Sequence, residues 1–236
     1  MAATKKIVIV GGGYAGVLTA KHLAKRIKKG KLQKEVEVTL IDKNPFHTML
    51  TELHEVAAGR VEEASIRMDL KEIFAGRAVD VVLDRIDGID FEGRTLTGRE
   101  KTYAYDYLVL GAGSKPAFWG VEGAAENAFS LWSFEDAVRL KEHLLALFRK
   151  AAPETDAAAR RAMLTFFVVG GGFTGVEMIG ELAEWIPFLC AEYRVARADV
   201  SLFLVDALDR ILPSLPEKRT AKVIGRLHKM GVTVRT

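Results

Sequence analysis

The chain has 236 residues, a net charge of +3 and a hydrophobic content of 49%. This composition is that of a globular protein with a sizeable core, and the small charge gives no support to nucleic-acid binding. The sequence has one cysteine, Cys190, which excludes an internal disulfide and a redox-active cysteine pair. We therefore expect a reducing, cytoplasmic compartment, and the sequence predicts neither a signal peptide nor a membrane-spanning helix.

The first predicted unit opens the chain. β-Branched residues at 6–10 predict a strand, the glycines at 11–16 predict a tight turn, and apolar residues at helical spacing over 17–27 predict a helix. A second strand is expected at 36–41, directly before Asp42. Strand, helix and strand in this order form a βαβ unit, which predicts a parallel sheet with a right-handed crossover.

The middle of the chain is predicted to connect two halves. Short apolar runs at 79–83 and 107–110 predict two further strands. The pattern over 134–150 predicts a helix, and residues 152–156 predict the loop that follows it. We expect this helix and loop to link the two halves of the chain.

The second half of the chain repeats the first. Residues 168–176 read VVGGGFTGV, whereas residues 9–17 read IVGGGYAGV. Around the second copy, a strand is expected at 165–169, a helix over 176–186 and another strand at 200–205. The predicted fold class is therefore α/β, with two Rossmann-like dinucleotide-binding units built on parallel sheets. The second unit is expected to be incomplete, because the sequence ends where another strand should begin.

Both turns carry the pattern G-x-G-x-x-G. Its glycines are Gly11, Gly13 and Gly16 in the first copy and Gly170, Gly172 and Gly175 in the second. The first glycine allows a tight turn, the second lets a pyrophosphate approach the backbone, and the third allows helix and strand to pack closely. The helix N-terminus then offers N–H groups and a partial positive charge to the anion. One such motif is weak evidence, but here the required strand and helix flank both copies.

An aspartate follows the second strand of each unit. Asp42 and Asp206 occupy these places, at a longer spacing from the glycines than is usual. A carboxylate there can accept hydrogen bonds from the ribose hydroxyls of an adenosine, and it repels a 2′-phosphate. The second site is therefore expected to prefer NADH to NADPH, with Arg210 as the one nearby residue that argues for NADPH.

With these motifs, the chain resembles the flavoprotein oxidoreductases that bind two dinucleotides on the pyridine nucleotide–disulfide reductase fold. Within that superfamily it resembles the type II NADH dehydrogenases, which are NADH:quinone oxidoreductases. The segments that carry the resemblance are 7–16, 40–47, 51–57, 105–113, 134–137, 169–181 and 210–213.

The resemblance implies three parts of the chain and two sets of ligand-binding residues. An FAD-binding domain would span 1–132, a linking helix and loop 133–159, and an incomplete NADH-binding domain 160–236. The residues that it assigns to FAD are Gly11, Gly13, Tyr14, Ala15, Gly16, Asp42, Lys43, Thr51, Val82, Ala112 and Gly113. The residues that it assigns to NADH are Gly170, Gly172, Phe173, Thr174, Gly175, Glu177 and Asp206.

The resemblance also implies individual roles. Lys43 and a backbone group of Val82 would lie beside the adenine of FAD, and the segment around Thr51 would pass the flavin. The segment 112–113 would return to the FAD phosphates. Glu177 is the one catalytic candidate, because it resembles the carboxylate near which nicotinamide meets flavin.

Some of these side chains have simpler interpretations. Glu177 could only favour a helix N-terminus through its charge. His47 and His54 are equally well explained as polar partners of a loop. Trp119 and Trp132 are expected to lie in the core.

The implied activity is transfer of a hydride from NADH to FAD, followed by electron transfer to a quinone of the respiratory chain. The resemblance also implies a homodimer, and contact with the cytoplasmic face of a membrane through a C-terminal part that this sequence lacks. No metal ligand is predicted. Two alternatives stay open, an FAD-dependent ferredoxin or rubredoxin reductase and a non-catalytic FAD-binding fragment. A disulfide reductase is excluded because Cys190 has no partner, and a sulfide-oxidising quinone reductase also needs further cysteines.

Overall fold

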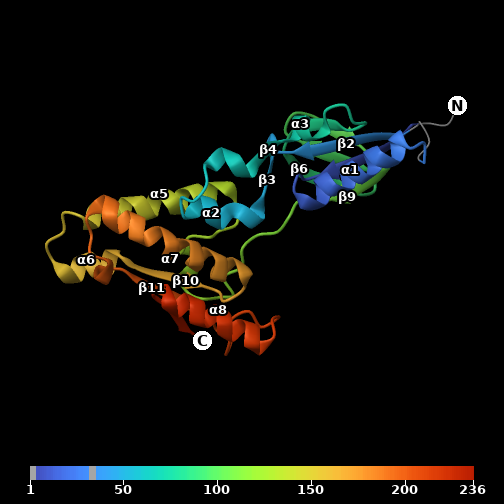
Figure 1. The fold of residues 1–236 in the computed structure, drawn as a ribbon. Coiled ribbons are helices and arrows are strands. Elements are labelled where there is room, and N and C mark those ends of the chain that lie inside the picture. Colours follow the sequence, from blue (N-terminus) through green and yellow to red (C-terminus); the bar gives the residue numbers. More distant parts are fainter. Residues whose placement is uncertain (1–3, 32–35) are drawn as a thin grey trace. The chain divides into compact units, whose positions relative to one another are not determined.

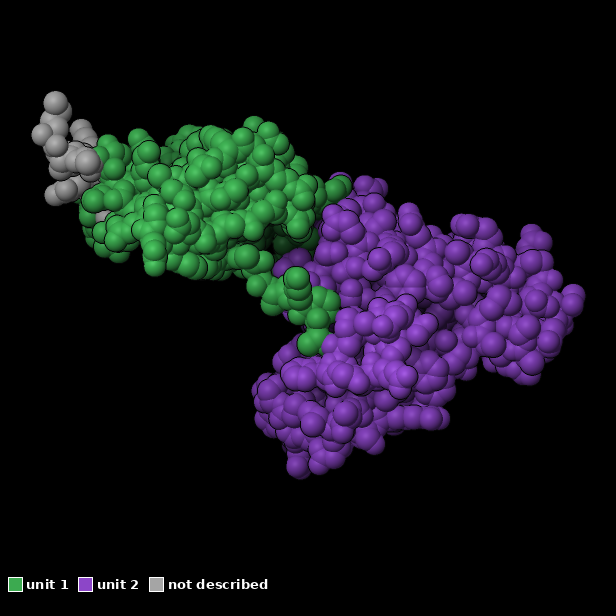
Figure 2. Space-filling view, turned by 180° about the vertical axis from the view of Figure 1, so that it is seen from behind, with its two compact units in different colours: residues 1–49, 67–117 green, residues 50–66, 118–236 purple. Residues whose placement is uncertain are grey.

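The computed structural model describes residues 4–31 and 36–236, and the chain folds into two compact units (Figures 1 and 2). Unit 1 comprises Met1–Met49 and Arg67–Ala117, and unit 2 comprises Leu50–Ile66 and Phe118–Thr236. The segment 50–66 therefore leaves the chain of unit 1 and folds with unit 2. The bounds of these units differ from the expected ranges 1–132, 133–159 and 160–236. The assignment of FAD to the first range and NADH to the last stays a prediction.

Unit 1 is built on a four-stranded parallel sheet. Its strands have the order β5-β2-β1-β9, and helix α1 connects β1 to β2. The bounds are β1 Lys5–Val10, α1 Tyr14–Lys28, β2 Val36–Asp42, β5 Asp80–Leu83 and β9 Tyr107–Leu110. All four predicted strands and the predicted helix are present, and the three pairings of the sheet are parallel.

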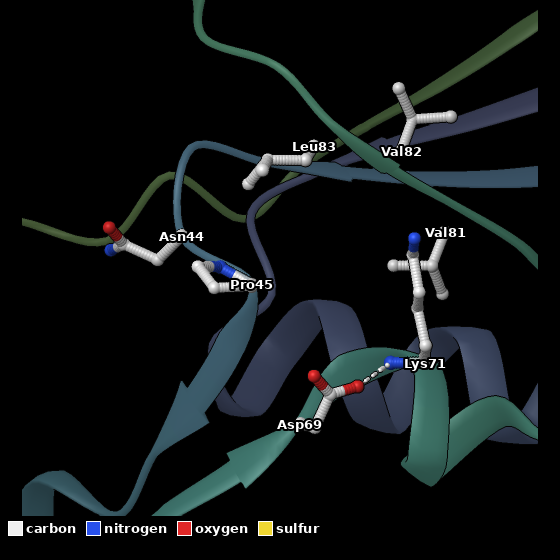
Figure 3. A pocket seen from close by; sticks show the side chains of 7 residues that line it. All are labelled: Asn44, Pro45, Asp69, Lys71, Val81, Val82 and Leu83. Atoms are coloured by element: carbon white, nitrogen blue, oxygen red, sulfur yellow. Dashed lines mark hydrogen bonds between the residues drawn. The ribbon is translucent and has the colours of Figure 1, made fainter.

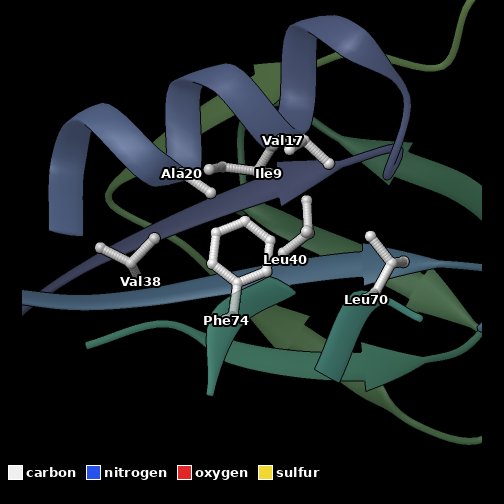
Figure 4. Close-up of a cluster of buried hydrophobic side chains, with 7 residues drawn as sticks. All are labelled: Ile9, Val17, Ala20, Val38, Leu40, Leu70 and Phe74. Atoms are coloured by element: carbon white, nitrogen blue, oxygen red, sulfur yellow. The ribbon is translucent and has the colours of Figure 1, made fainter. Parts of the chain in front are cut away.

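The core of unit 1 lies on both faces of this sheet, as expected for parallel strands. One cluster comprises Ile9, Val17, Ala20, Val38, Leu40, Leu70 and Phe74, drawn in Figure 4. In that view α1 supplies Val17 and Ala20 to the layer above the strands. A second cluster comprises Val8, Ile41, Leu96 and Tyr103. Neighbouring strand residues belong to opposite clusters because side chains alternate across a strand.

Two small antiparallel sheets complete unit 1, and the sequence patterns did not predict them. The first pairs β3 with β4, and α3 follows it; the second has the order β6-β7-β8. The bounds are β3 Phe46–Thr48, β4 Arg67–Asp69, α3 Leu70–Phe74, β6 Ile86–Asp90, β7 Thr95–Gly98 and β8 Thr102–Ala104. Strands of three to five residues are too short to show a clear alternation of apolar and polar residues.

Hydrogen bonds to the buried carboxylate of Asp84 stabilise the β6-β7-β8 sheet. Its Oδ2 accepts a hydrogen bond of 2.7 Å from the Tyr103 hydroxyl, and its Oδ1 accepts bonds from the N–H groups of Arg85 and Arg99. The hydrogen bond from Tyr103, together with these N–H groups, lowers the pKa of Asp84. A Cβ on Gly98 would overlap with the same carboxylate, so this position needs glycine.

We expect Asp84→Asn to lower the stability of the protein near neutral pH. A carboxylate whose pKa is lower in the folded state contributes stability above its unfolded pKa, about 3.9, and this contribution is lost as pH falls through the folded value. Melting temperatures of wild type and Asp84→Asn across pH 3–7 should therefore differ most at the neutral end and converge at the acid end. Tyr103→Phe, which removes one donor, should lower stability less. A constant difference across this pH range would contradict the assignment.

Unit 2 holds a second parallel sheet, with the strand order β10-β11-β12. Helix α7 connects β10 to β11, and α8 connects β11 to β12. The bounds are β10 Thr165–Val169, α7 Phe173–Tyr193, β11 Ser201–Val205, α8 Glu217–Lys229 and β12 Val232–Arg235. The repeat seen in the sequence is therefore a repeat of structure, with β10, α7 and β11 in the places of β1, α1 and β2. Helix α7 continues through Pro187, seven residues beyond its predicted end, with Leu189 and Cys190 buried.

The remaining helices of unit 2 pack beside α7. Helix α5 begins at a capping box, in which Ser133 and Asp136 each accept a hydrogen bond from the other residue's N–H. Both α2 and α5 contact α7 (Figure 1). The bounds are α2 Leu53–Ala57, α4 Ala124–Asn127, α5 Phe134–Ala151 and α6 Ala157–Met163, with single 3₁₀ turns at Leu50–Glu52, Glu63–Ile66 and Arg197–Asp199. The predicted helix 134–150 and the loop after it are confirmed, but this helix is a packed part of unit 2.

The two tryptophans expected in the core lie at the surface. Trp119 is 91% exposed and Trp132 is 45% exposed, so the expectation was wrong. Both lie between β9 and α5, where the chain forms little regular structure. Within the described ranges, no helix is both long enough and apolar enough to cross a membrane.

Candidate functional site: two glycine turns

The glycine turn of unit 1 lies where β1 ends and α1 begins. Gly11 has a φ of +107°, a conformation that favours glycine, and its N–H donates a hydrogen bond of 2.8 Å to the Ile41 carbonyl. Gly13 precedes the first residue of α1. The turn therefore lies at the carboxyl ends of β1 and β2, the edge at which open α/β sheets bind ligands.

Each glycine of this turn meets a different steric demand. A Cβ on Gly11 would overlap with the Gly111 carbonyl, and a Cβ on Gly16 would overlap with the Gly11 carbonyl. A Cβ on Gly13 would meet nothing within 4 Å. Gly11 and Gly16 are thus needed by the turn itself, whereas Gly13 leaves open space beside its backbone. The third glycine, Gly16, leaves room for the carbonyl of the first, Gly11. The sequence predicted only that this glycine allows helix and strand to pack closely.

The start of α1 has the properties of an anion site. The first helical bond runs from the Val17 N–H to the Gly13 carbonyl, so the N–H groups of Ala15 and Gly16 precede the helical ladder. The first turn of α1 contains no acidic residue, and no side chain caps Gly13. A pyrophosphate placed in the space beside Gly13 would therefore meet N–H donors and the positive end of the helix dipole.

Asp42 lies against the turn and is held by the backbone. Its Oδ2 accepts a hydrogen bond of 2.5 Å from the Gly12 N–H, and its Oδ1 accepts one of 2.7 Å from the Asn44 N–H. A carboxylate has about four acceptor positions, so these bonds leave capacity for ribose hydroxyls. The carboxylate therefore connects the glycine turn to the predicted ribose position.

A small hollow of about 120 Å³ lies between strand β5 and the residues that follow β2. Figure 3 shows its seven lining residues, Asn44, Pro45, Asp69, Lys71, Val81, Val82 and Leu83. Asp69 accepts a hydrogen bond of 2.7 Å from the Lys71 N–H and so caps α3. Val82, predicted to meet the adenine, lies in this hollow, and Lys43 is exposed directly after β2.

The other residues assigned to FAD lie in three places. Tyr14 and Ala15 begin α1, while Ala112 and Gly113 follow β9 and are exposed, with a φ of +77° at Gly113. Thr51 lies in unit 2, where its hydroxyl donates a hydrogen bond of 3.2 Å to Glu52. The structure thus brings all the assigned residues except Thr51 into unit 1.

The turn of unit 2 repeats this geometry. Gly170 has a φ of +109°, and its N–H donates a hydrogen bond of 2.8 Å to the Val205 carbonyl. A Cβ on Gly175 would overlap with the Gly170 carbonyl, whereas a Cβ on Gly172 would meet nothing within 4 Å. Asp206 accepts hydrogen bonds from the Gly171 N–H and, at 2.7 Å, from the Leu208 N–H. The two turns therefore share the same backbone bond, the same steric demand at the third glycine, the same open space and the same supporting carboxylate. They differ at the first glycine, because a Cβ on Gly170 would meet nothing within 4 Å.

The remaining residues assigned to NADH lie on α7. Phe173 and Thr174 are exposed at its start, and the first turn contains no acidic residue. Glu177 lies beyond that turn and is exposed, so the interpretation that it only favours the helix N-terminus is not supported. Its catalytic role stays a prediction.

Sequence reasoning missed the middle glycine of each motif. A Cβ on Gly12 would come within 2.7 Å of the Leu70 side chain, and a Cβ on Gly171 within 2.6 Å of the Ile211 side chain. Both residues also donate the N–H bond to the supporting aspartate. Three consecutive glycines in both copies were the available signal, because the motif itself requires only two of them.

His47 is a second residue whose role the structure clarifies. Its side chain is 4% exposed, and its Nδ1–H donates a hydrogen bond of 2.9 Å to the Gly12 carbonyl. Its ring also contacts the Tyr14 ring edge to face, with centroids 4.9 Å apart. The interpretation of His47 as a polar partner of a loop is confirmed, and the loop is the glycine turn.

We expect His47→Ala to weaken FAD binding while the protein still folds. The change leaves the Gly12 carbonyl without this donor, a loss of about 1–3 kcal/mol, and the turn is then held less firmly for the pyrophosphate. The measurement is the FAD dissociation constant by flavin fluorescence, with the exposed His143→Ala as the control. Equal FAD affinity in the two variants would contradict this role.

A known protein family matches almost the whole length of the chain. The profile of the family described as Pyridine nucleotide-disulphide oxidoreductase matches residues 5–236. The chain belongs to this family. The predicted α/β fold with parallel sheets in both units is thereby confirmed.

A curated relative with a known name is similar in sequence but longer than this chain. The type II NADH:quinone oxidoreductase of Staphylococcus aureus (strain NCTC 8325 / PS 47) is 31% identical over 228 residues, which are 97% of this chain and 55% of the relative. This chain thus spans about half the length of the curated relatives it matches.

Solved structures of related proteins share the fold. The structure of NDH2 from Plasmodium falciparum in complex with NADH has a TM-score of 0.87 at 21% identity, covering 99% of this chain and 48% of that one. The sulfide:quinone oxidoreductase from Aquifex aeolicus has a TM-score of 0.72 at 20% identity, covering 98% and 50%. At such identities these likenesses show the fold alone.

Proposed function

We propose that the protein binds FAD at the turn of unit 1 and NADH at the turn of unit 2, and that it works as a type II NADH dehydrogenase. The observation that carries this proposal is the pair of matching turns, each with open space beside its central glycine and a fixed aspartate. Membership of the pyridine nucleotide-disulphide oxidoreductase family supports the two ligands. The name of the Staphylococcus aureus relative supports NADH as the donor and a quinone as the acceptor.

In this proposal unit 1 holds FAD through its backbone. The N–H groups at the start of α1 bind the pyrophosphate beside Gly13, and Asp42 accepts hydrogen bonds from the adenosine ribose. Val82 and Lys43 flank the adenine, and Ala112 and Gly113 approach the phosphates. When bound, FAD supplies the two-electron redox chemistry, so the residues of the chain mainly bind and orient.

Unit 2 would hold NADH in the same way. The start of α7 binds the pyrophosphate beside Gly172, and the Asp206 carboxylate accepts hydrogen bonds from the adenosine ribose. The same carboxylate repels the 2′-phosphate of NADPH, which favours NADH. Glu177 would orient the nicotinamide, which accelerates hydride transfer by positioning the reacting atoms.

The quinone acceptor determines where the protein would work. We infer that the complete protein is a peripheral protein at the cytoplasmic face of a membrane, because respiratory quinones are dissolved in the lipid. The greater length of the relatives leaves room for membrane-binding segments outside this sequence. A homodimer is part of the same proposal.

Anaerobic reduction and reoxidation of the complete protein test this function. The purified protein should be yellow, and NADH should bleach the flavin band in the absence of oxygen. A soluble quinone should restore the band, whereas oxidised ferredoxin or rubredoxin should not. Bleaching without reoxidation by quinone would favour the ferredoxin or rubredoxin reductase. A colour that NADH leaves unchanged would favour a non-catalytic FAD-binding protein.

A further inference from the structure

Unit 2 contains a group of metal-ligating side chains that the proposed function does not use. His54 and Glu55 of α2 and Glu181 of α7 each direct one donor atom to the same place, and the three donor atoms lie within 4.8 Å of one another. All three side chains are half-buried. One imidazole nitrogen and two carboxylate oxygens form a donor set that suits divalent transition-metal ions.

The packing of α2 against α7 fixes this arrangement. Gly59, two residues after α2, has a φ of +67° and lies so close to Trp185 of α7 that a Cβ would come within 2.7 Å of the indole ring. The backbone at the end of α2 is therefore held against α7. This close approach brings donors that are far apart in the sequence to one place.

A positive charge already occupies the position between the two carboxylates. The Arg60 guanidinium forms an ion pair with Glu181 through Nη1, and its Nε lies 3.9 Å from the Glu55 Oε1. The hydrogen bond with Glu181 raises the pKa of Arg60. The Arg60 side chain is 55% exposed, whereas that of Glu181 is 15% exposed. The carboxylates are thus the fixed partners, and the cation is the one that can move into solvent.

An open hollow of about 440 Å³ adjoins this group and gives access from solvent. His54 and Glu181 line it, together with two further carboxylates of α7, Glu177 and Glu184. The facing helix α8 contributes Lys222 and Arg226, and Arg226 lies 3.6 Å from Glu184. Within the ranges that the structure describes, the His54 imidazole forms no hydrogen bond or ion pair. The hollow therefore leaves space for water ligands, and His54 is available as a donor.

We propose that His54, Glu55 and Glu181 form a binding site for a divalent transition-metal cation of the zinc class, which takes the place of the Arg60 guanidinium. The cation would have one nitrogen and two oxygen ligands from the chain, with water from the hollow completing the coordination. Magnesium and calcium prefer sites built of oxygen alone, so the imidazole favours zinc over these ions. The bound cation would join α2 to α7 more firmly than the arginine does.

Calorimetric titration of the complete protein, without an affinity tag and after removal of metals with a chelator, tests this site. Zinc chloride should show one saturable site, and magnesium chloride should bind much more weakly. His54→Ala and Glu181→Gln should each weaken zinc binding at least about tenfold, because each removes a ligand. Arg60→Gln should strengthen it, since the competing cation is gone. The exposed His143→Ala serves as the control and should bind like the wild type.

Three results would overturn the proposal. These results are the absence of saturable zinc binding, zinc binding by the two ligand variants equal to that of His143→Ala, and an unchanged zinc affinity in Arg60→Gln. Circular dichroism verifies that each variant is folded. Because His54 forms no ion pair in the described ranges, His54→Ala keeps the test valid even if Glu181→Gln fails to fold.

Discussion

Replacing Gly175 by alanine is expected to weaken NADH binding, and so to slow reduction of the flavin at low NADH concentration, while FAD stays bound. The added Cβ would overlap with the Gly170 carbonyl, so the turn must open and the first N–H groups of α7 move. Strain of this kind costs about 1–3 kcal/mol, which corresponds to a loss of NADH affinity of roughly tenfold or more. Anaerobic stopped-flow reduction at increasing NADH concentration measures this loss.

The equivalent substitution in unit 1, Gly16→Ala, should affect FAD binding instead of NADH binding. A Cβ on Gly16 would overlap with the Gly11 carbonyl, in the same way as in the second turn. Gly16→Ala should therefore yield a protein that purifies without the yellow colour and binds added FAD weakly. If either variant lost the ligand assigned to the opposite unit instead, the assignment of the two turns would be reversed.

Gly172→Ala is the matched control, because it separates a ligand clash from strain in the protein. Its Cβ would meet nothing within 4 Å, so the melting temperature of the ligand-free protein should change little. NADH binding should still be lost, because the methyl group takes the space of the pyrophosphate. Normal NADH binding by Gly172→Ala would show that the open space is not used by a ligand.

The second large effect is expected at Asp206, which would both support the turn and select the nucleotide. Asp206→Ala removes the acceptor of the Gly171 and Leu208 N–H groups, a loss of about 1–3 kcal/mol, and it also removes a ribose ligand. The Michaelis constant for NADH should rise about tenfold or more. Removing the negative charge should also improve the use of NADPH relative to NADH, by on the order of 1 kcal/mol.

Asp206→Asn distinguishes the two roles of this residue. The amide keeps one oxygen to accept a backbone N–H, but it carries no charge. It should therefore retain more NADH affinity than Asp206→Ala and show the same gain in relative use of NADPH. A nucleotide preference that stays unchanged in both variants would mean that Asp206 serves only the turn, and Arg210 would then need testing.

The glycine turns could be predicted from the sequence because their determinants are local. Gly11 and Gly170 follow β-branched strands and precede helical patterns, and the structure gives both a positive φ. Asp42 and Asp206 could also be placed, since each directly follows a strand. Their hydrogen bonds to Gly12 and Gly171 were not predicted, because such bonds depend on how the aspartate side chain meets the turn.

Features that depend on distant contacts could not be predicted. Segment 50–66 folds with unit 2, and its Arg60 pairs with Glu181, which lies 121 positions away. No periodicity in the sequence reports such a contact. Trp119 was wrongly expected in the core because hydrophobic character alone does not show whether a neighbouring element covers the side chain.

The central claim is that each turn holds the pyrophosphate of one dinucleotide. A crystal structure of the complete protein, soaked with FAD and NADH under anaerobic conditions, tests it most directly. One pyrophosphate should lie beside Gly13 at the start of α1, and the other beside Gly172 at the start of α7. A turn that stays closed to its ligand, or a dinucleotide bound away from both helix N-termini, would contradict the claim.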